Sequence, residues 1–282
     1  MQYSHGIILG LIQGLAEFLP ISSSGHLILA RILLGIQTDT PELKMFDILL
    51  HVGTLIPVIV LFWKDWMAML RHPIKNKTLL LLIVASLPTL AIYVLAKVLT
   101  PESINGFAVF DSGWFLGVSF LITGFLLLLT ESVSRRKNRQ ASSEVTFPRA
   151  LLMGIFQGLG LLPGVSRSGS TISGGILSGL DRKSAAKFSF MMSAPAIVGS
   201  LLMEGKDALE AGYLDQINWP VTAVGMLVAC ICGFIAIRFM MKLINRISLN
   251  HFAFYVCLLG IIIITLQIIG VSWVPAFEIP TV

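Results

Sequence analysis

Apolar residues along this chain come in long unbroken runs separated by short polar segments. A bilayer hydrocarbon core of about 30 Å takes roughly 20 helical residues to cross. The runs lack the strict two-residue alternation of a membrane β-barrel, so they predict transmembrane helices. Six runs are long enough to cross, at residues 46–63, 78–99, 113–130, 184–203, 219–241 and 250–270.

Two further apolar stretches, residues 6–34 and 150–180, are interrupted near their middle. The first is broken by the segment PISSSG at residues 20–25, and the second by PGVSRSGST at residues 163–171. Each half is about 11 to 15 residues long, which as a helix is about 20 Å and too short to cross. Each stretch is therefore expected to enter the membrane and return.

The distribution of charge predicts the orientation of these segments. Most of the 20 basic residues lie after residues 63 and 130 and around residues 180 and 241, and loops rich in Lys and Arg stay cytoplasmic. If residues 150–180 crossed, the basic loops on either side would face opposite compartments, so this stretch is predicted to be re-entrant. Residues 6–34 are predicted to be re-entrant as well, because they resemble residues 150–180. With both stretches re-entrant, the two termini lie outside. The opposite loops carry acidic residues, among them Asp39, Glu102, Asp111 and Asp215.

The chain contains an internal repeat. A shift of 144 residues aligns identical residues at both breaks: Gly10, Gln13, Gly14, Leu15, Ser22, Ser24 and Gly25 with Gly154, Gln157, Gly158, Leu159, Ser166, Ser168 and Gly169. Three spans, an odd number, separate the two breaks, so the second copy enters from the opposite face. The repeats, about residues 6–131 and 150–270 of one integral membrane domain, are thus inverted, and their breaks are expected to meet near the midplane.

Composition agrees with this architecture. The chain has 282 residues, of which 55% are hydrophobic and 12% charged, and its mean hydropathy of +0.86 excludes a soluble globular protein. The net charge of +5 comes from the loop clusters, so it indicates topology and not nucleic-acid binding. Three cysteines inside apolar segments indicate neither a disulfide framework nor a metal pair. The absence of Lys and Arg before Arg31 argues against a cleaved signal peptide. The prediction is an all-α polytopic membrane protein with six transmembrane helices and two re-entrant helical hairpins.

Ionisable residues at the breaks are the candidates for chemistry. Glu17 is the only carboxylate of the first broken stretch, with Gln13 one turn earlier on the same face. A charge at this depth is costly and indicates function, the alternative being a structural ion pair with Arg167. Arg167 precedes an apolar half-helix whose free N–H groups, with a guanidinium, match the oxygens of a phosphate. The expected ligand is therefore an oxyanion.

Three further polar residues lie near these positions. His26 opens the second half-helix of the first stretch, where a functional histidine beside Glu17 is favoured over a purely structural one. Asp47 and His51 are one turn apart on one helical face. They either line the entrance or help to hold a cation, or they serve as an interfacial cap and a buried partner of a carbonyl group.

These motifs resemble the undecaprenyl-diphosphate phosphatase family, the integral membrane enzymes associated with bacitracin resistance. One family signature stands here as QGLAEFLPISSSGH, from Gln13 to His26, and the other as PGVSRSGST, from Pro163 to Thr171. The resemblance covers essentially the whole chain. It implies removal of the terminal phosphate from a C55 polyprenyl diphosphate, which recycles the lipid carrier of peptidoglycan synthesis, with Mg²⁺ or Ca²⁺ assisting.

The resemblance also implies the set of site residues. Carried over by position, these are Glu17, Ser23, His26, Ser166, Arg167 and Thr171, with Gln13 and Ser168 as further substrate-binding residues. Because Gln13 is a neutral amide where the signature also allows an acid, cation binding falls mainly to Glu17 and to the diphosphate oxygens.

The predicted mechanism uses Arg167 and the half-helix N–H groups to stabilise charge on the phosphoryl oxygens. Ser23 is the leading nucleophile with His26 as its base, while direct attack by His26 or by an activated water stays open. Catalysis is expected on the outer side of the cytoplasmic membrane. The rival hypotheses are a secondary transporter or flippase for an anionic or lipid-phosphate substrate, and a structural membrane protein. The sequence leaves the oligomeric state open.

Overall fold

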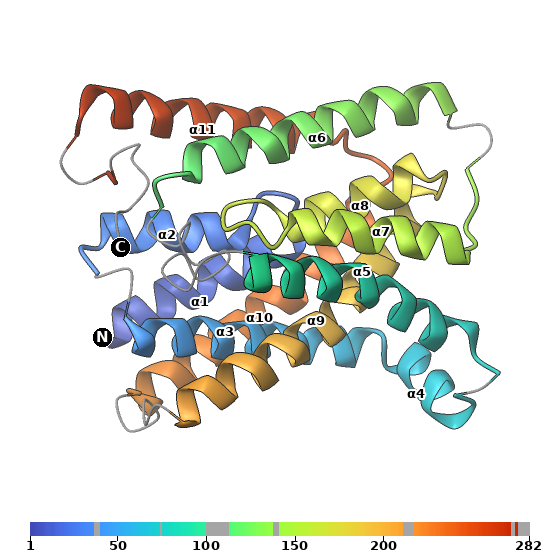
Figure 1. The fold of residues 1–282 in the computed structure, drawn as a ribbon, viewed down its shortest axis with the longest axis horizontal. Helices are drawn as coiled ribbons and strands as arrows, with labels where there is room; N and C mark the ends of the chain where they lie inside the picture. The colour runs from blue at the N-terminus through green and yellow to red at the C-terminus, as the bar shows by residue number, and fades with distance from the viewer. Residues whose placement is uncertain are drawn as a thin grey trace.

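The computed structural model describes residues 1–36, 40–73, 75–99, 113–137, 141–210, 217–271 and 274–275. These residues form eleven helices and a single isolated β-bridge (Figure 1). The acidic loop residues Asp39, Glu102, Asp111 and Asp215 lie outside the described residues.

The six predicted spans are confirmed as helices that are long and apolar enough to cross a membrane. Their predicted boundaries differ from the observed ones by a few residues in most cases, because polar residues at the ends extend the helices. The spanning helices are α3 (Pro41–Leu61), α5 (Lys77–Leu99), α6 (Leu116–Lys137), α9 (Arg182–Glu210), α10 (Trp219–Leu243) and α11 (Asn250–Ile269).

The second broken stretch folds into two short helices that turn back on each other, α7 (Phe147–Leu159) and α8 (Arg167–Leu177). Its two ends lie side by side, because the Ser142 N–H donates to Gly179 O and the Asp181 N–H donates to Ser142 O. A segment whose entry and exit are hydrogen-bonded together has the hairpin geometry that re-entry requires.

The first broken stretch forms the matching pair, α1 (Tyr3–Phe18) and α2 (Ser23–Leu33). Helix α1 packs against α10 of the other half, and α7 packs against α5 in the same way. Aligned glycines allow both close approaches: a Cβ atom on Gly10 would lie 2.4 Å from Gly225 O, and one on Gly154 would lie 2.1 Å from Ala85 O. The two halves therefore use equivalent positions for equivalent packing.

Two features position the rest of the molecule. Helices α6 and α11 lie side by side along one edge (Figure 1) and pack closely together. A short amphipathic helix that the sequence did not predict, α4 (Trp63–Arg71), follows α3. Its Asp65 carboxylate accepts a hydrogen bond from Lys187 Nζ at 2.7 Å, which ties α4 to α9. The largest buried cluster, with Phe18, Phe190 and Met192 among its members, lies between the two halves.

Candidate active site

Helices α2 and α8 begin in the same way. At each break a serine, Ser22 or Ser166, caps the helix by accepting a hydrogen bond from the N–H group three residues later, at 3.1 Å and 3.0 Å. The first helical residues are then Ser23 in α2 and Arg167 in α8, which are aligned by the 144-residue repeat. Their side chains reach the same group.

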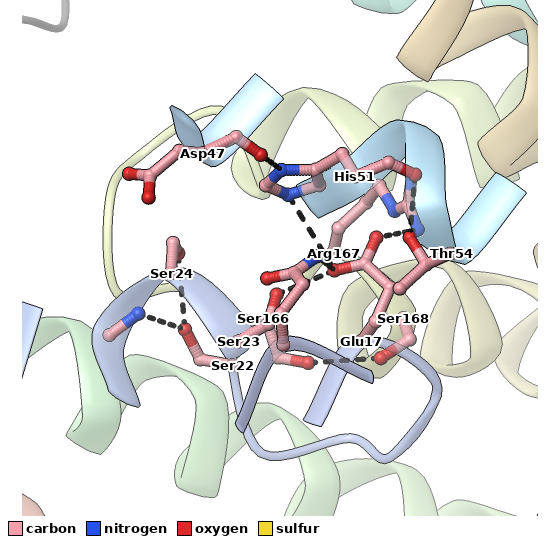
Figure 2. A network of polar contacts seen from close by, with 12 residues as sticks. Glu17, Ser22, Ser23, Ser24, Asp47, His51, Thr54, Ser166, Arg167 and Ser168 are labelled. Carbon is pink, nitrogen blue, oxygen red and sulfur yellow. Dashed lines mark hydrogen bonds and ion pairs between the residues drawn. The ribbon is translucent and has the colours of Figure 1, made fainter. Parts of the chain in front are cut away.

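That group is the carboxylate of Glu17, at the end of α1 (Figure 2). Its Oε1 accepts a hydrogen bond from Arg167 Nη2 at 2.6 Å. Its Oε2 accepts one from Ser23 Oγ at 2.6 Å and another from Gln13 Nε2 at 2.9 Å. The Glu17 side chain is only 4% exposed, so the charge is buried but fully hydrogen-bonded. The predicted meeting of the two breaks is therefore seen in the fold.

His51 of α3 approaches the same carboxylate. Its Nε2 lies 3.7 Å from Glu17 Oε2, and its Nδ1 donates to the backbone oxygen of Asp47 at 2.7 Å (Figure 2). Because a carbonyl oxygen only accepts, Nδ1 carries the proton, and the ring is held with Nε2 toward Glu17. His51 therefore lies beside the site, as one interpretation predicted, and it also binds a backbone carbonyl group, as the other predicted.

Hydrogen bonds between the breaks fix their relative position. The Gly164 N–H donates to Ser24 Oγ at 3.2 Å, and Ser168 Oγ donates to Leu19 O at 2.9 Å. The second break is also anchored to α6, where Thr123 Oγ1 accepts from the Ser166 N–H at 3.0 Å. Thr123 was not among the predicted site residues, although a threonine inside an apolar span is a detectable signal of a polar contact.

His26 takes partners different from those predicted. Its Nδ1 bonds to Ser22 O and its Nε2 to the Tyr255 hydroxyl of α11, each at 2.7 Å, and the two rings stack. Ser23 Oγ donates to Glu17 instead. The expected Ser23–His26 pair is thus not formed between these two described residues, because the cap at Ser22 turns the Ser23 hydroxyl toward α1 and leaves the imidazole facing α11.

The remaining predicted residues of the second break are mostly structural in their contacts. Ser166 caps α8, and Ser168 binds the first break. Thr171 is buried, and its hydroxyl contacts Arg167 O and Ser189 Oγ. In contrast, the N–H groups of Arg167 and Ser168 have no hydrogen-bond partner within the described residues. Because both groups lie in the first turn of α8, they are available to an anion.

Comparison with known sequences decides the family. Residues 6–262 match the family described as bacitracin resistance protein BacA. The chain is 42% identical to the undecaprenyl-diphosphatase of Halothermothrix orenii, over 92% of this chain and 96% of the relative. It is 38% identical to that of Carboxydothermus hydrogenoformans, over 96% and 99%, and 39% identical to undecaprenyl-diphosphatase 4 of Bacillus thuringiensis, over 95% and 98%. The chain belongs to the BacA family.

This BacA-family chain has a second ion pair beside the site. Arg31 of α2 donates through Nη2 to the carboxylate of Asp47, one turn before His51 on α3. The Arg31 side chain is only 6% exposed. The pair ties α2 to α3, and Asp47 in turn orients His51 through its backbone oxygen. Asp47 was a predicted candidate but Arg31 was not predicted as its partner, because the two are 16 residues apart on different helices.

The oxygen atoms around Glu17 can also be tested as cation ligands. Gln13 Oε1 is buried without a hydrogen-bond partner within the described residues, and it belongs to the amide whose Nε2 donates to Glu17. No group of three or more His, Cys, Asp or Glu side chains suited to a metal occurs in the described part of this BacA-family chain. One carboxylate and one amide oxygen suit Mg²⁺, which usually binds through one or two protein ligands, water and substrate phosphates.

Proposed function

We propose that this chain hydrolyses undecaprenyl diphosphate to undecaprenyl phosphate and inorganic phosphate, and so recycles the lipid carrier of peptidoglycan synthesis. The observation that carries the proposal is the convergence of Ser23 and Arg167 on the Glu17 carboxylate. The Ser23 hydroxyl can act as a nucleophile, the Glu17 carboxylate can accept its proton, and the Arg167 guanidinium can bind phosphate. The hydroxyl and the guanidinium group each lie within hydrogen-bond distance of the Glu17 carboxylate. The names of the relatives support the same substrate.

Arg167 and the start of α8 bind the terminal phosphoryl group. The one hydrogen bond that the guanidinium makes within the described residues goes to Glu17. A guanidinium has five N–H donors, so the others are available to phosphate oxygens. The N–H groups of Arg167 and Ser168 add two donors at the positive end of the helix dipole. These groups stabilise the charge that develops on the phosphoryl oxygens.

Ser23 attacks the terminal phosphorus as its proton moves to Glu17 Oε2. The bond from phosphorus to the bridging oxygen breaks, and undecaprenyl phosphate leaves with that oxygen and takes the proton from Glu17. A water then attacks the phosphoserine and gives a proton to Glu17, which returns it to Ser23 Oγ as inorganic phosphate departs. The 2.6 Å bond between Ser23 and Glu17 supports this proton route.

His51 positions the Glu17 carboxylate. Its Nε2 lies near the oxygen that accepts from Ser23, and its ring is held by the Asp47 carbonyl. A divalent cation, Mg²⁺ or Ca²⁺, would be held by Glu17 and Gln13 together with the diphosphate oxygens. When bound, it neutralises charge on the substrate phosphates.

The proposed setting is the outer side of the cytoplasmic membrane, with both termini outside and the inverted repeats entering from opposite faces. The basic loops after residues 63 and 130 support this orientation. The hairpin closure between Ser142 and Gly179 supports re-entry of the second stretch. The lipid tail is expected to extend sideways from the site into the bilayer.

The decisive experiment measures phosphate release from a long-chain polyprenyl diphosphate by detergent-solubilised protein. Wild-type protein is expected to release phosphate, whereas a carrier hydrolyses nothing. Ser23→Ala and Glu17→Gln are each expected to lower the rate of release by at least about 10²-fold. Ser86→Ala is the matched control, because in the part of the chain that the structure describes this hydroxyl donates only to Leu82 O within α5. If Glu17→Gln lost activity while Ser23→Ala kept it, the nucleophile would be a water molecule and not the Ser23 hydroxyl.

A further inference from the structure

A polar pocket lies away from the Glu17 site, where three segments meet. Its volume is about 660 Å³, and its lining includes Arg135 of α6, Arg182 of α9 and Arg246 of the segment between α10 and α11. We call it the arginine pocket. Its segments belong to the basic loops that sequence analysis interpreted only as topology signals.

Glu131 holds two of the three arginines in place. Its carboxylate is buried and accepts from Arg182 Nη2 at 2.7 Å, from Arg135 Nε at 3.1 Å and from the Leu249 N–H at 3.0 Å. Arg182 also donates to Ile247 O at 3.1 Å, so it joins all three segments. A single carboxylate therefore fixes two guanidinium groups, and positive charge remains in excess.

The other acidic residue of the lining, Asp181, leaves three arginines against two carboxylates, so the pocket keeps a smaller excess of positive charge. Both carboxylate oxygens of Asp181 are used by Ser184, one by its N–H at 2.9 Å and one by its hydroxyl at 2.8 Å, so Asp181 serves as the cap of α9. Arg246 is exposed, and its side chain forms no ion pair or hydrogen bond within the described residues. The pocket thus has one guanidinium without a partner beside two that are held in position.

We propose that the arginine pocket binds a phosphate group. Arginines from three segments line one pocket, and guanidinium groups match the oxygens of a phosphate. Asn245 and Ser248 add neutral hydrogen-bonding groups. The neighbouring α6–α11 pair exposes large apolar side chains, including Phe125 at 68% and Phe254 at 66%. This surface suits acyl chains, so an anionic phospholipid headgroup fits the site as well as a free phosphate ion does.

The pocket is connected to the second break through α6. Glu131 and Thr123, which holds the Ser166 N–H, lie on this one helix and are separated by about 12 Å at 1.5 Å per residue. A phosphate that rigidifies Arg135 and Arg182 therefore also stabilises the helix that anchors the active-site loop. The site is separate from the proposed catalytic residues, so it does not depend on their assignment.

The test compares thermal unfolding of purified protein in detergent with added phosphatidylglycerol, phosphatidylcholine or inorganic phosphate. A ligand that binds the folded state raises the unfolding midpoint. Phosphatidylglycerol is expected to raise the midpoint of wild type and of Arg71→Gln, an exposed arginine outside the pocket. In Arg246→Gln and Arg135→Gln the apparent affinity is expected to fall roughly tenfold, because a charge-assisted hydrogen bond is lost.

The comparison of phosphatidylglycerol with inorganic phosphate distinguishes a lipid headgroup from a free phosphate ion. A shift with inorganic phosphate that Arg246→Gln reduces identifies a free ion, whereas a shift confined to phosphatidylglycerol identifies a lipid headgroup. Phosphate bound at the Glu17 site affects wild type and Arg246→Gln equally and cancels in the comparison. Equal shifts in wild type, Arg246→Gln and Arg135→Gln would overturn the proposal, as would an equal loss in Arg71→Gln. Phosphate release by Arg246→Gln at saturating substrate is expected to match wild type, which keeps this test independent of the catalytic proposal.

Discussion

Arg167 Nη2 and Glu17 Oε1 lie 2.6 Å apart, although the two residues are 150 positions apart in the chain. Each lies at the break of its own helical hairpin, and the 144-residue repeat aligns Arg167 with Ser23, the other residue bound to this carboxylate. Equivalent positions of the two repeats thus supply a guanidinium group that binds one oxygen of Glu17 and a hydroxyl group that binds the other. This use of one backbone motif for two chemical roles gives the site its asymmetry.

Replacement of Arg167 by Lys tests the geometry of phosphate binding. The charge is kept but the planar fork is lost, so kcat is expected to fall by about 10²-fold. Phosphate release at varied substrate concentration measures the change. Arg149→Lys is the control, because within the described residues the Arg149 side chain donates only to the backbone oxygen of Glu144. Equal activity of the Arg167→Lys and wild-type proteins would show that the bidentate contact is not used.

The role of Glu17 as proton acceptor predicts a large effect of an isosteric change. Glu17→Gln removes the base and leaves the Arg167 guanidinium without its anionic partner. Activity is expected to fall by about 10² to 10⁴-fold, the usual contribution of a positioned acid or base. Binding of a non-hydrolysable diphosphate analogue should persist, since Arg167 is free to bind phosphate. Loss of binding together with activity would assign Glu17 to substrate binding instead.

His51 and His26 are predicted to differ in their effect on catalysis. His51→Leu removes the group beside Glu17 and should lower kcat with little change in KM, and His51→Gln, which restores a polar side chain, should recover part of the loss. Tyr255→Phe removes the partner of His26 on α11 and should leave kcat close to wild type. A larger fall of kcat in Tyr255→Phe than in His51→Leu would indicate that His26 acts in catalysis.

Cation dependence is expected to respond to the residue at position 13. A chelator should abolish phosphate release, and added Mg²⁺ should restore it. Gln13→Glu adds a second carboxylate beside Glu17 and should lower the Mg²⁺ concentration that gives half-maximal activity, whereas Gln13→Leu should raise it. Full activity in the presence of chelator would remove the cation from the proposal.

The close packing of α1 on α10 and of α7 on α5 predicts two equivalent destabilising substitutions. Gly10→Ala and Gly154→Ala place a Cβ atom against a backbone carbonyl and should each cost about 1 to 3 kcal/mol. Gly199→Ala is the control, because a Cβ there meets nothing within 4 Å, and it should stabilise α9 by about 0.5 to 1 kcal/mol. Thermal unfolding in detergent measures all three. Tolerance of Ala at Gly10 would contradict the packing of α1.

The sequence by itself determined the six spans, the two breaks and the residues at their tips. Apolar length is a local property, and Ser, Gly and Pro interrupt a helix wherever they occur, so both are visible without a fold. The repeat added the expectation that Glu17 and Arg167 meet, because two polar interruptions in one membrane must be buried against each other. Helix α4 was not predicted from the sequence, because it is short and amphipathic and follows α3 without a polar gap.

Apart from the contact between Glu17 and Arg167, tertiary structure decided which side chains of the site bind each other. The Ser22 cap directs Ser23 to Glu17 and leaves His26 to Tyr255, while α3 brings His51 to the carboxylate that sequence proximity had assigned to His26. The arginines that the sequence presented as a topology signal also become a pocket only when α6, α9 and the segment before α11 converge on Glu131. Hydrogen bonds have a reach of about 3 Å and depend on direction, so the order of residues along the chain cannot specify them until the helices are packed.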